Sequence, residues 1–213
     1  MKNGYIFLGA PGSGKGTQAK KLLDASGIPS VSTGDLIRSE IKRETPLGLE
    51  CKPYLTSGKL VPDTIIVRMF KQWVETHAVA TFISDGFPRT IEQAKVFDVL
   101  ISQELGYTVT IVFFKVGLKT LKKRILGRRI CPKCGNIQNE FFNPPLVSGQ
   151  CDRCASAFET RIDDTEEIIQ TRYDSYLEST MPIIEHYKSQ VITIDAEQGP
   201  DEIFVSIRKQ LSV

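Results

Sequence analysis

Short apolar runs alternate with amphipathic stretches along the chain. Two of these runs, Phe82–Ile83 and Ile111–Phe114, are β-branched or aromatic throughout and show no polar alternation. Uninterrupted apolar character is typical of strands buried on both faces of a parallel sheet. The candidate strands are Tyr5–Leu8, Thr81–Ser84, Val109–Phe114 and Val191–Ile194, with a weaker one near Ser30–Ser32.

Segments with helical character separate these strands. Strands that alternate with helices predict an α/β fold, in which a doubly wound parallel sheet carries helices on both faces. The predicted helices are Lys15–Ala25, Asp35–Lys42, Pro62–Glu75, Thr90–Glu104, Lys119–Leu126, Glu166–Tyr187 and Asp201–Leu211.

Two segments interrupt this rhythm. Residues 128–163 hold four paired cysteines, Pro144–Pro145 and several glycines, without a clear helix. Residues 32–61 form a short helical stretch that contains Gly34 and Gly58. We therefore expect a core made of 1–31, 62–127 and 164–213, with one insertion at 32–61 and another at 128–163.

Composition and charge narrow the possible partners. The 213 residues include 27 Lys and Arg against 25 Asp and Glu, a net charge of +2 that gives no general reason to expect nucleic acid or an anionic membrane. No apolar run approaches the roughly 18 residues needed to span a bilayer. The first apolar run leads directly into a glycine-rich loop and lacks a cleavage site for export. We expect a cytoplasmic protein.

The segment Gly9–Thr17 satisfies the pattern G-x-x-x-x-G-K between a predicted strand and a predicted helix. Glycines let backbone N–H groups converge on phosphate oxygens, and the N-terminus of the following helix adds positive potential. Lys15 would reach the β- and γ-phosphates. Gly16 stands where a hydroxyl residue is usual after the lysine, and Thr17 follows it.

The four paired cysteines have the spacing of a zinc site. Cys131-x-x-Cys134 and Cys151-x-x-Cys154 are separated by 16 residues, within the C-x₂-C-x₁₅₋₂₀-C-x₂-C pattern. Four thiolates would complete a tetrahedron around zinc and leave no position for water, so the metal would be structural. Unmetallated or disulfide-linked pairs are the alternative. Cys51 lies outside this pattern.

A zinc segment of this size could instead be a ribbon that binds nucleic acid. Residues 128–163 contain five Lys and Arg against four Asp and Glu, a net charge of +1 that becomes −1 with zinc and four thiolates. A ribbon that grips a phosphate backbone should be clearly basic. The charge therefore favours a zinc-stiffened lid over a ribbon.

Further motifs follow the phosphate loop in order: Ser32–Arg38, Gly58–Asp63, Asp85–Thr90 with Gln93, Gly127–Arg129 and Arg161–Asp164. Together they cover nearly the whole chain and resemble the adenylate kinase family, in the long-lid form with a zinc-type lid. The resemblance implies a P-loop core with a small helical insertion that binds the nucleoside monophosphate (NMP) and a lid over ATP. It identifies 32–61 as that insertion and 128–163 as that lid.

The resemblance also implies roles for individual residues, which form three overlapping groups: ATP-binding, AMP-binding and catalytic. ATP would be bound by Gly12, Ser13, Gly14, Lys15, Gly16, Thr17, Arg124, Arg128, Ile137, Gln138 and Gln198. AMP would be bound by Thr33, Arg38, Lys59, Leu60, Val61, Gly86, Phe87, Pro88, Arg89, Gln93, Arg161 and Arg172. The catalytic group would be Lys15, Arg89, Arg124, Arg128, Arg161, Arg172, Asp163, Asp164 and Asp85, the last near the waters of Mg²⁺.

The activity implied is reversible phosphoryl transfer from Mg-ATP to AMP, giving two ADP. An acceptor phosphate that is already ionised needs no general base to remove a proton. The sequence agrees with this, because neither of its two histidines, His77 and His186, lies in a motif. Another nucleoside monophosphate kinase or a GTP-using relative remains an alternative, although Thr33 and the long lid weigh against a pyrimidine acceptor. A third possible function is that of a non-catalytic zinc-ribbon module that binds nucleotide. We expect a monomer.

Overall fold

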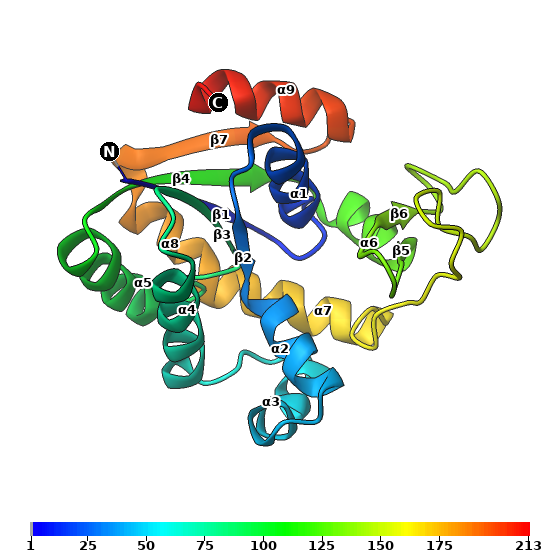
Figure 1. The fold of residues 1–213 in the computed structure, drawn as a ribbon, viewed down its shortest axis with the longest axis horizontal. Helices are drawn as coiled ribbons and strands as arrows, with labels where there is room; N and C mark the ends of the chain where they lie inside the picture. Colours follow the sequence, from blue (N-terminus) through cyan, green and yellow to red (C-terminus); the bar gives the residue numbers. More distant parts are fainter. Residues whose placement is uncertain (1) are drawn as a thin grey trace.

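The computed structural model describes residues 2–213 and is built on a five-stranded parallel sheet of order β2-β3-β1-β4-β7 (Figure 1). All its strand pairs are parallel, which confirms the prediction made from the uninterrupted apolar runs. The strands are β1 (Lys2–Gly9), β2 (Ser30–Ser32), β3 (Thr81–Asp85), β4 (Tyr107–Lys115) and β7 (Val191–Asp195).

Helices cover both faces of this sheet, as predicted (Figure 1). Alternate residues of β1 serve opposite faces: Phe7 packs beneath α1 and α9, whereas Ile6 and Leu8 pack against α4, α5 and α8. All three side chains are buried, which explains why this part of β1, covered on both faces, is apolar at consecutive positions. The helices are α1 (Lys15–Ser26), α2 (Thr33–Lys42), α3 (Pro46–Ser57), α4 (Asp63–His77), α5 (Ile91–Asp98), α6 (Leu118–Leu126), α7 (Glu166–Ser175), α8 (Met181–His186) and α9 (Pro200–Leu211).

Two helices expected to be continuous are widened into π-helical turns. The stretch 90–104 consists of α5 followed by a π-helical segment at Val99–Glu104. The stretch 166–187 is divided into α7, a π-helical segment at Tyr176–Thr180 and α8. Pro182 in the first turn of α8 has no N–H to donate, so the regular hydrogen-bond ladder cannot pass through it.

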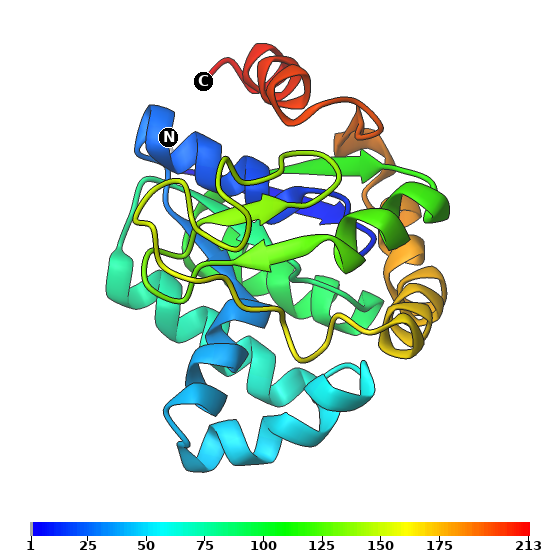
Figure 2. The same cartoon turned by 90° about the vertical axis from the view of Figure 1, so that its right-hand side faces the viewer.

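The two interrupting segments leave the sheet at different places (Figure 2). Residues 32–61 contain α2 and α3, and the start of α3 was not predicted separately. Residues 128–163 carry an antiparallel pair, β5 (Arg128–Ile130) and β6 (Ile137–Asn139). A backbone bridge between Ile130 and Glu159 ties the end of the segment back to its beginning.

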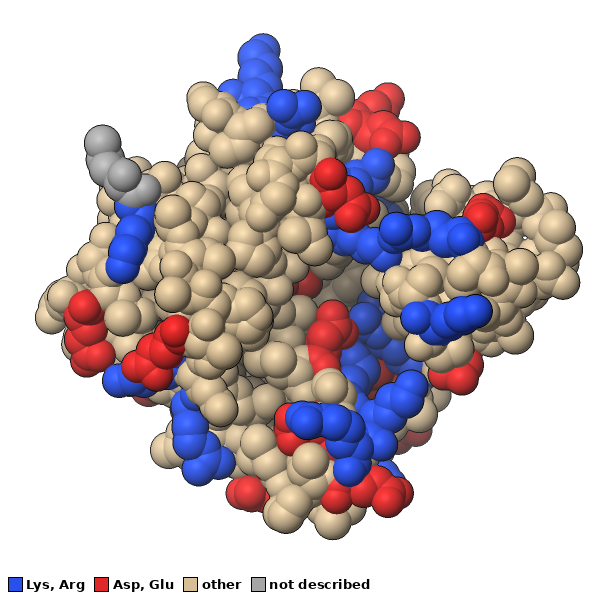
Figure 3. Space-filling view, viewed as in Figure 1, with Lys and Arg blue, Asp and Glu red and all other residues tan. Residues whose placement is uncertain are grey.

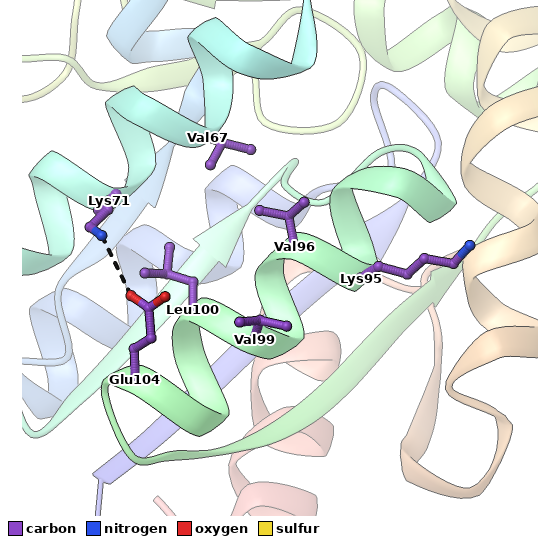
Figure 4. Close-up of a pocket in the computed structure, with 7 residues that line it drawn as sticks. All are labelled: Val67, Lys71, Lys95, Val96, Val99, Leu100 and Glu104. Atoms are coloured by element: carbon purple, nitrogen blue, oxygen red, sulfur yellow. Dashed lines mark hydrogen bonds and ion pairs between the residues drawn. The ribbon is translucent and has the colours of Figure 1, made fainter.

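A surface groove of about 400 Å³ lies between α4 and the end of α5 (Figure 4). Its floor is apolar, and an ion pair of 3.4 Å between Lys71 Nζ and Glu104 Oε2 borders it. None of the predicted site residues lines this groove. In the described part of the chain, no helix is both long and apolar enough to cross a bilayer.

Candidate active site

The carboxyl ends of three neighbouring strands bring the predicted motifs together. The glycine-rich loop follows Gly9 at the end of β1, Ser32 ends β2 and Asp85 ends β3. Parallel sheets bind ligands at this edge, because the loops that leave adjacent strands face one another there. Lys and Arg side chains border the hollow between the main body and the lobe of residues 128–163 (Figure 3).

The loop from Gly9 to Thr17 wraps around the ammonium group of Lys15. Lys15 Nζ donates to Gly9 O at 2.8 Å, to Ala10 O at 3.0 Å and to Ser13 Oγ at 3.3 Å. Gly12 has φ 81° and lies against α6, where a Cβ would approach Ile125 Cγ1 to 2.7 Å. Only glycine satisfies both the positive φ and this close approach.

Lys15 and Asp85 are half-buried groups of opposite charge that lie close enough to influence each other electrostatically. Burial lowers the pKa of Lys15 to about 8, although Asp85 opposes the shift. Burial raises the pKa of Asp85, and Lys15 opposes that shift. Asp85 also lies beside the start of α1, since a Cβ on Gly16 would meet its Oδ2 at 3.1 Å. The pair therefore holds one cation and one carboxylate at the mouth of the phosphate loop.

A second group of predicted residues lies where β2 and β3 end. The buried Thr33 donates its hydroxyl to Gly86 O at 3.1 Å, and Arg89 Nε donates to the same oxygen at 2.6 Å. Phe87 is fully buried and packs on Phe70, so its ring faces the core and not the hollow. Pro88 is also buried, after a cis peptide bond.

The predicted backbone stretch Lys59–Val61 connects α3 to α4. Lys59 is exposed, Leu60 is half-buried and Val61 is buried in the core. The Lys59 N–H donates to Tyr54 O at 3.0 Å, so it is already used within the turn that ends α3.

Three arginines converge on two buried aspartates between these regions, and a fourth joins them through the exposed Asp35. Asp163 Oδ2 lies 2.8 Å from Arg172 Nη1 and 3.6 Å from Arg38 Nη1, and the Asp163 side chain is 2% exposed. Arg128 donates through Nε to Asp164 Oδ2 at 2.7 Å, and Asp164 is also nearly inaccessible. Arg161 completes the cluster through the carboxylate of Asp35, 3.2 Å from its Nη2.

In this arginine–aspartate cluster, burial and the repulsion between neighbouring arginines make the charged guanidinium groups less favourable. Burial lowers the pKa of Arg161 to about 9, and the charges of Arg128 and Arg38 lower it further. Burial likewise lowers the pKa of Arg172 to about 10. Among the described residues, the buried Arg161 Nε finds no hydrogen-bond acceptor. Crowded, incompletely paired guanidinium groups favour binding of a multiply charged anion, and guanidinium geometry suits phosphate.

Arg124 stands apart from that cluster, beside the phosphate loop. Its Nη1 donates to Ser13 O at 3.5 Å and its Nη2 to Gln198 O at 3.2 Å. Its guanidinium carbon also lies 5.5 Å from the centroid of the Phe142 ring. The structure thus brings Arg124 and the backbone of Gln198 together with the loop, and adds an aromatic ring from residues 128–163.

Ile137 and Gln138 lie on β6, within residues 128–163. Gln138 is 3% exposed, and its amide hydrogen-bonds Asp152 through both the side chain and the backbone N–H of that residue. Ile137 pairs with Ile130 across the β5–β6 ladder. The Gln138 side chain therefore serves the interior of its own segment.

The four paired cysteines meet in one cluster, which fits a zinc site. Their sulfur atoms all lie within 4.8 Å of one another. The Sγ atoms of Cys131 and Cys154 are 3.4 Å apart, and those of Cys134 and Cys151 are 3.6 Å apart. Zinc–sulfur bonds of about 2.3 Å in a tetrahedron place the sulfurs about 3.8 Å apart. The thiols are free, so the disulfide alternative is not adopted here.

We expect removal of zinc to lower the melting temperature by roughly 5 °C or more, because the metal would replace a core that residues 128–163 are too few to build. Thermal unfolding before and after chelation measures this, with metal content determined in both samples. Adding zinc back should restore the original temperature. An unchanged melting temperature in a sample proven to be metal-free would contradict a structural role.

Sequence reasoning assigned no role to Asp35, Asp63 or Phe142. Asp35 accepts hydrogen bonds from both Arg38 and Arg161, and its position three residues before Arg38 on one helix was the available signal. Asp63 contacts Gln93, and its place at the end of the Gly58–Asp63 motif and the start of a predicted helix was the available signal. Nothing local distinguished Phe142 from other aromatic residues.

A phosphate loop that faces a set of buried arginines defines the class of P-loop phosphotransferases. The comparisons with known proteins agree with that class. The family model described as "Adenylate kinase" matches residues 7–192. The chain belongs to the adenylate kinase family.

Relatives named adenylate kinase match over nearly their full length. One from Clostridium perfringens is 40% identical over 209 residues, 97% of each chain. Another, from Thermodesulfovibrio yellowstonii, is 41% identical over 95% of each chain. A third, from Enterococcus faecalis, is 41% identical over 96% of each chain. The protein is therefore a phosphotransferase that acts on nucleotides.

Proposed function

We propose that this protein transfers the γ-phosphoryl group of Mg-ATP reversibly to AMP, giving two ADP. One arrangement carries the proposal: two separate phosphate-binding regions border the same arginine–aspartate cluster. The loop around Lys15 would hold ATP. Arg38 and Arg89, beside Thr33, would hold AMP, and Arg38 belongs to the cluster directly through Asp163.

Phosphoryl transfer between two anions needs fixed positive charge more than it needs proton transfer. The bond from the γ-phosphorus to the bridging oxygen of ATP breaks, and a bond to an ionised oxygen of the AMP phosphate forms. No proton has to leave the acceptor. The two histidines are engaged elsewhere: His77 stacks on Trp73 and His186 pairs with Asp98. The arginines would neutralise charge that develops on the transferred group.

Magnesium would join this site through the nucleotide. The residues that fit it are Asp85, a carboxylate beside the phosphate loop, and Thr17, a hydroxyl residue in the first turn of α1. Mg²⁺ keeps several waters and binds through few carboxylates plus phosphates, which suits a single aspartate. When bound, the ion neutralises phosphate charge.

Residues 32–61 and 128–163 would move as two covers over the core, which would consist of 1–31, 62–127 and 164–213. The first would close over AMP and the second over ATP, and closure would exclude water from the γ-phosphate. We propose that the protein works as a cytoplasmic monomer whose partners are ATP, AMP and ADP.

A coupled turnover assay tests the proposal directly. Mg-ATP is supplied with AMP, GMP, CMP or UMP, each alone, and ADP formation is followed. Strong turnover with AMP alone supports the proposal. Preference for CMP or UMP would keep the reaction type but overturn the proposed acceptor. The same assay with GTP in place of ATP tests the donor.

The depressed pKa of Lys15 predicts a pH dependence for ATP capture. Because the pKa of Lys15 is about 8 in the nucleotide-free protein, the ammonium loses its proton as the pH rises through that value. We expect kcat/KM for ATP to fall above about pH 8, since this parameter reports ionisations of the enzyme form that binds ATP. At saturating AMP that form is the AMP-bound enzyme, in which Lys15 would still be uncovered. Steady-state kinetics from pH 6 to 10 at saturating AMP measure it.

The same protein supplies the control. At saturating ATP, the nucleotide phosphates cover Lys15 and favour its charged form, so kcat/KM for AMP should lack the alkaline decline. An equal decline for both substrates would assign the ionisation to another group.

A further inference from the structure

The side-chain amide of Gln93 is held in one orientation. Gln93 is 2% exposed. Its Oε1 accepts from the backbone N–H of Arg89 at 2.7 Å, and its Nε2 donates to Asp63 Oδ1 at 2.6 Å. A backbone N–H only donates and a carboxylate only accepts, so exchanging the oxygen and nitrogen of the amide would lose both hydrogen bonds.

Asp63 is itself fixed from two sides. It is the first residue of α4, and its Oδ2 accepts from Thr90 Oγ1 at 3.3 Å. Thr90 is the N-cap of α5, where its hydroxyl oxygen accepts from the Gln93 N–H at 3.1 Å. The carboxylate thus joins the first turns of α4 and α5, and both of its oxygens have partners.

Each end of the Gln93 amide retains one unused capacity. Nε2 carries a second hydrogen, and Oε1 has a second lone pair. This pattern is complementary to adenine, whose 6-amino group donates beside a ring nitrogen that accepts. Hypoxanthine, the base of IMP, carries a carbonyl at position 6 and a ring N–H at position 1. A fixed Gln93 would oppose acceptor to acceptor there, whereas a reversed amide would match.

We propose that Asp63 is a positioning residue that sets the base specificity of the acceptor site by fixing the Gln93 amide. The proposal rests on the proposed function, in which Gln93 meets the base of AMP. Asp63 would not touch the nucleotide. It would act by making the reversed amide unfavourable, so that 6-amino purines are accepted and 6-oxo purines are rejected.

The test compares AMP with IMP as acceptors, at saturating Mg-ATP, for the wild-type protein, Asp63→Ala and Asp63→Asn. Hydrogen bonds to charged groups support discrimination of about tenfold or more. We expect the ratio of kcat/KM for AMP to that for IMP to fall by about tenfold in Asp63→Ala. In Asp63→Asn, Oδ1 can still accept from Gln93 Nε2, so most of the discrimination should return.

Glu92→Ala is the matched control. Glu92 is exposed in the first turn of α5, next to Gln93, and contributes a carboxylate there. Its removal should leave the AMP-to-IMP ratio unchanged. KM for ATP should also stay unchanged in the Asp63 variants, and a melting curve for each variant establishes that it is folded.

Two results would overturn the proposal. The first is a wild-type ratio near one. The second is an Asp63→Ala ratio equal to the wild-type ratio, and if kcat/KM falls equally for AMP and IMP while the ratio is kept, Asp63 only supports the structure. Absence of AMP turnover in the wild-type protein is a separate failure, that of the proposed function itself.

Discussion

Replacing Lys15 with methionine should reduce phosphoryl transfer by on the order of 10³-fold, mainly in kcat. Methionine keeps the length of the side chain but removes the ammonium, which donates to three oxygens of the loop. In the nucleotide complex the same group would be free to follow the β- and γ-phosphates. Its contribution should grow as negative charge moves between them, which is why kcat is expected to respond more than KM.

Initial rates of ADP formation at saturating Mg-ATP and AMP provide the measurement. Lys21→Met is the matched control, because Lys21 lies on the same helix as Lys15. Its ammonium pairs with Asp201, whose side chain is 90% exposed. The control should retain activity close to that of the wild-type protein. A Lys15→Met variant with near-normal kcat would contradict a role for Lys15 in transfer.

Replacing Asp163 with alanine should lower the free energy of unfolding by about 3–5 kcal/mol, because it leaves buried guanidinium groups without their counter-charge. Asp163 is 2% exposed and is the carboxylate shared by Arg172 and Arg38. Its partners are largely shielded from solvent, with side-chain exposures of 17% for Arg172 and 23% for Arg38. Burial is also the first cause of the lowered pKa of Arg172. Activity should fall as well, since the arginines would lose their common anchor.

Urea unfolding at neutral pH measures the stability change. Asp201→Ala removes the same type of side chain from an exposed ion pair, and such pairs contribute about 0–1 kcal/mol. The two variants therefore separate a buried counter-charge from a surface one. A loss for Asp163→Ala no larger than that for Asp201→Ala would show that the cluster does not depend on this carboxylate.

The sheet could be predicted from the sequence because its physical cause is local. A strand covered on both faces has to be apolar at nearly every position, and Ile111–Phe114 shows this without reference to the rest of the chain. The glycine-rich loop is local as far as the backbone is concerned, since φ 81° at Gly12 favours glycine, whereas the close approach of α6 is a second and distant reason for glycine there. The spacing of the four cysteines is a local signal as well, because each C-x-x-C pair brings two sulfur atoms to one side of a tight turn.

Features that depend on distant partners could not be predicted in this way. One such feature is the hydrogen bond from the Thr180 hydroxyl to Arg89 O, 91 residues away in sequence, at 3.0 Å. Gln138 lies in a buried network whose other member, Asp152, is 14 residues away in sequence. The role of Asp63 appears only when α4 and α5 are seen to begin side by side.

The carboxylate of Asp35 has a consequence for how anions enter the site. Its Oδ1 accepts from Arg38 Nη2 at 2.6 Å and from Arg161 Nη2 at 3.2 Å, so these two cations already share a resident anion. A phosphate that binds them as proposed must exchange with this internal competitor. The measured affinity for the phosphate would then be the difference between how strongly the arginines bind the phosphate and how strongly they bind the Asp35 carboxylate. Phosphate binding would also release fewer solution counterions than it would from arginines that lack an aspartate partner. Binding at Arg38 and Arg161 would be buffered against changes in ionic strength.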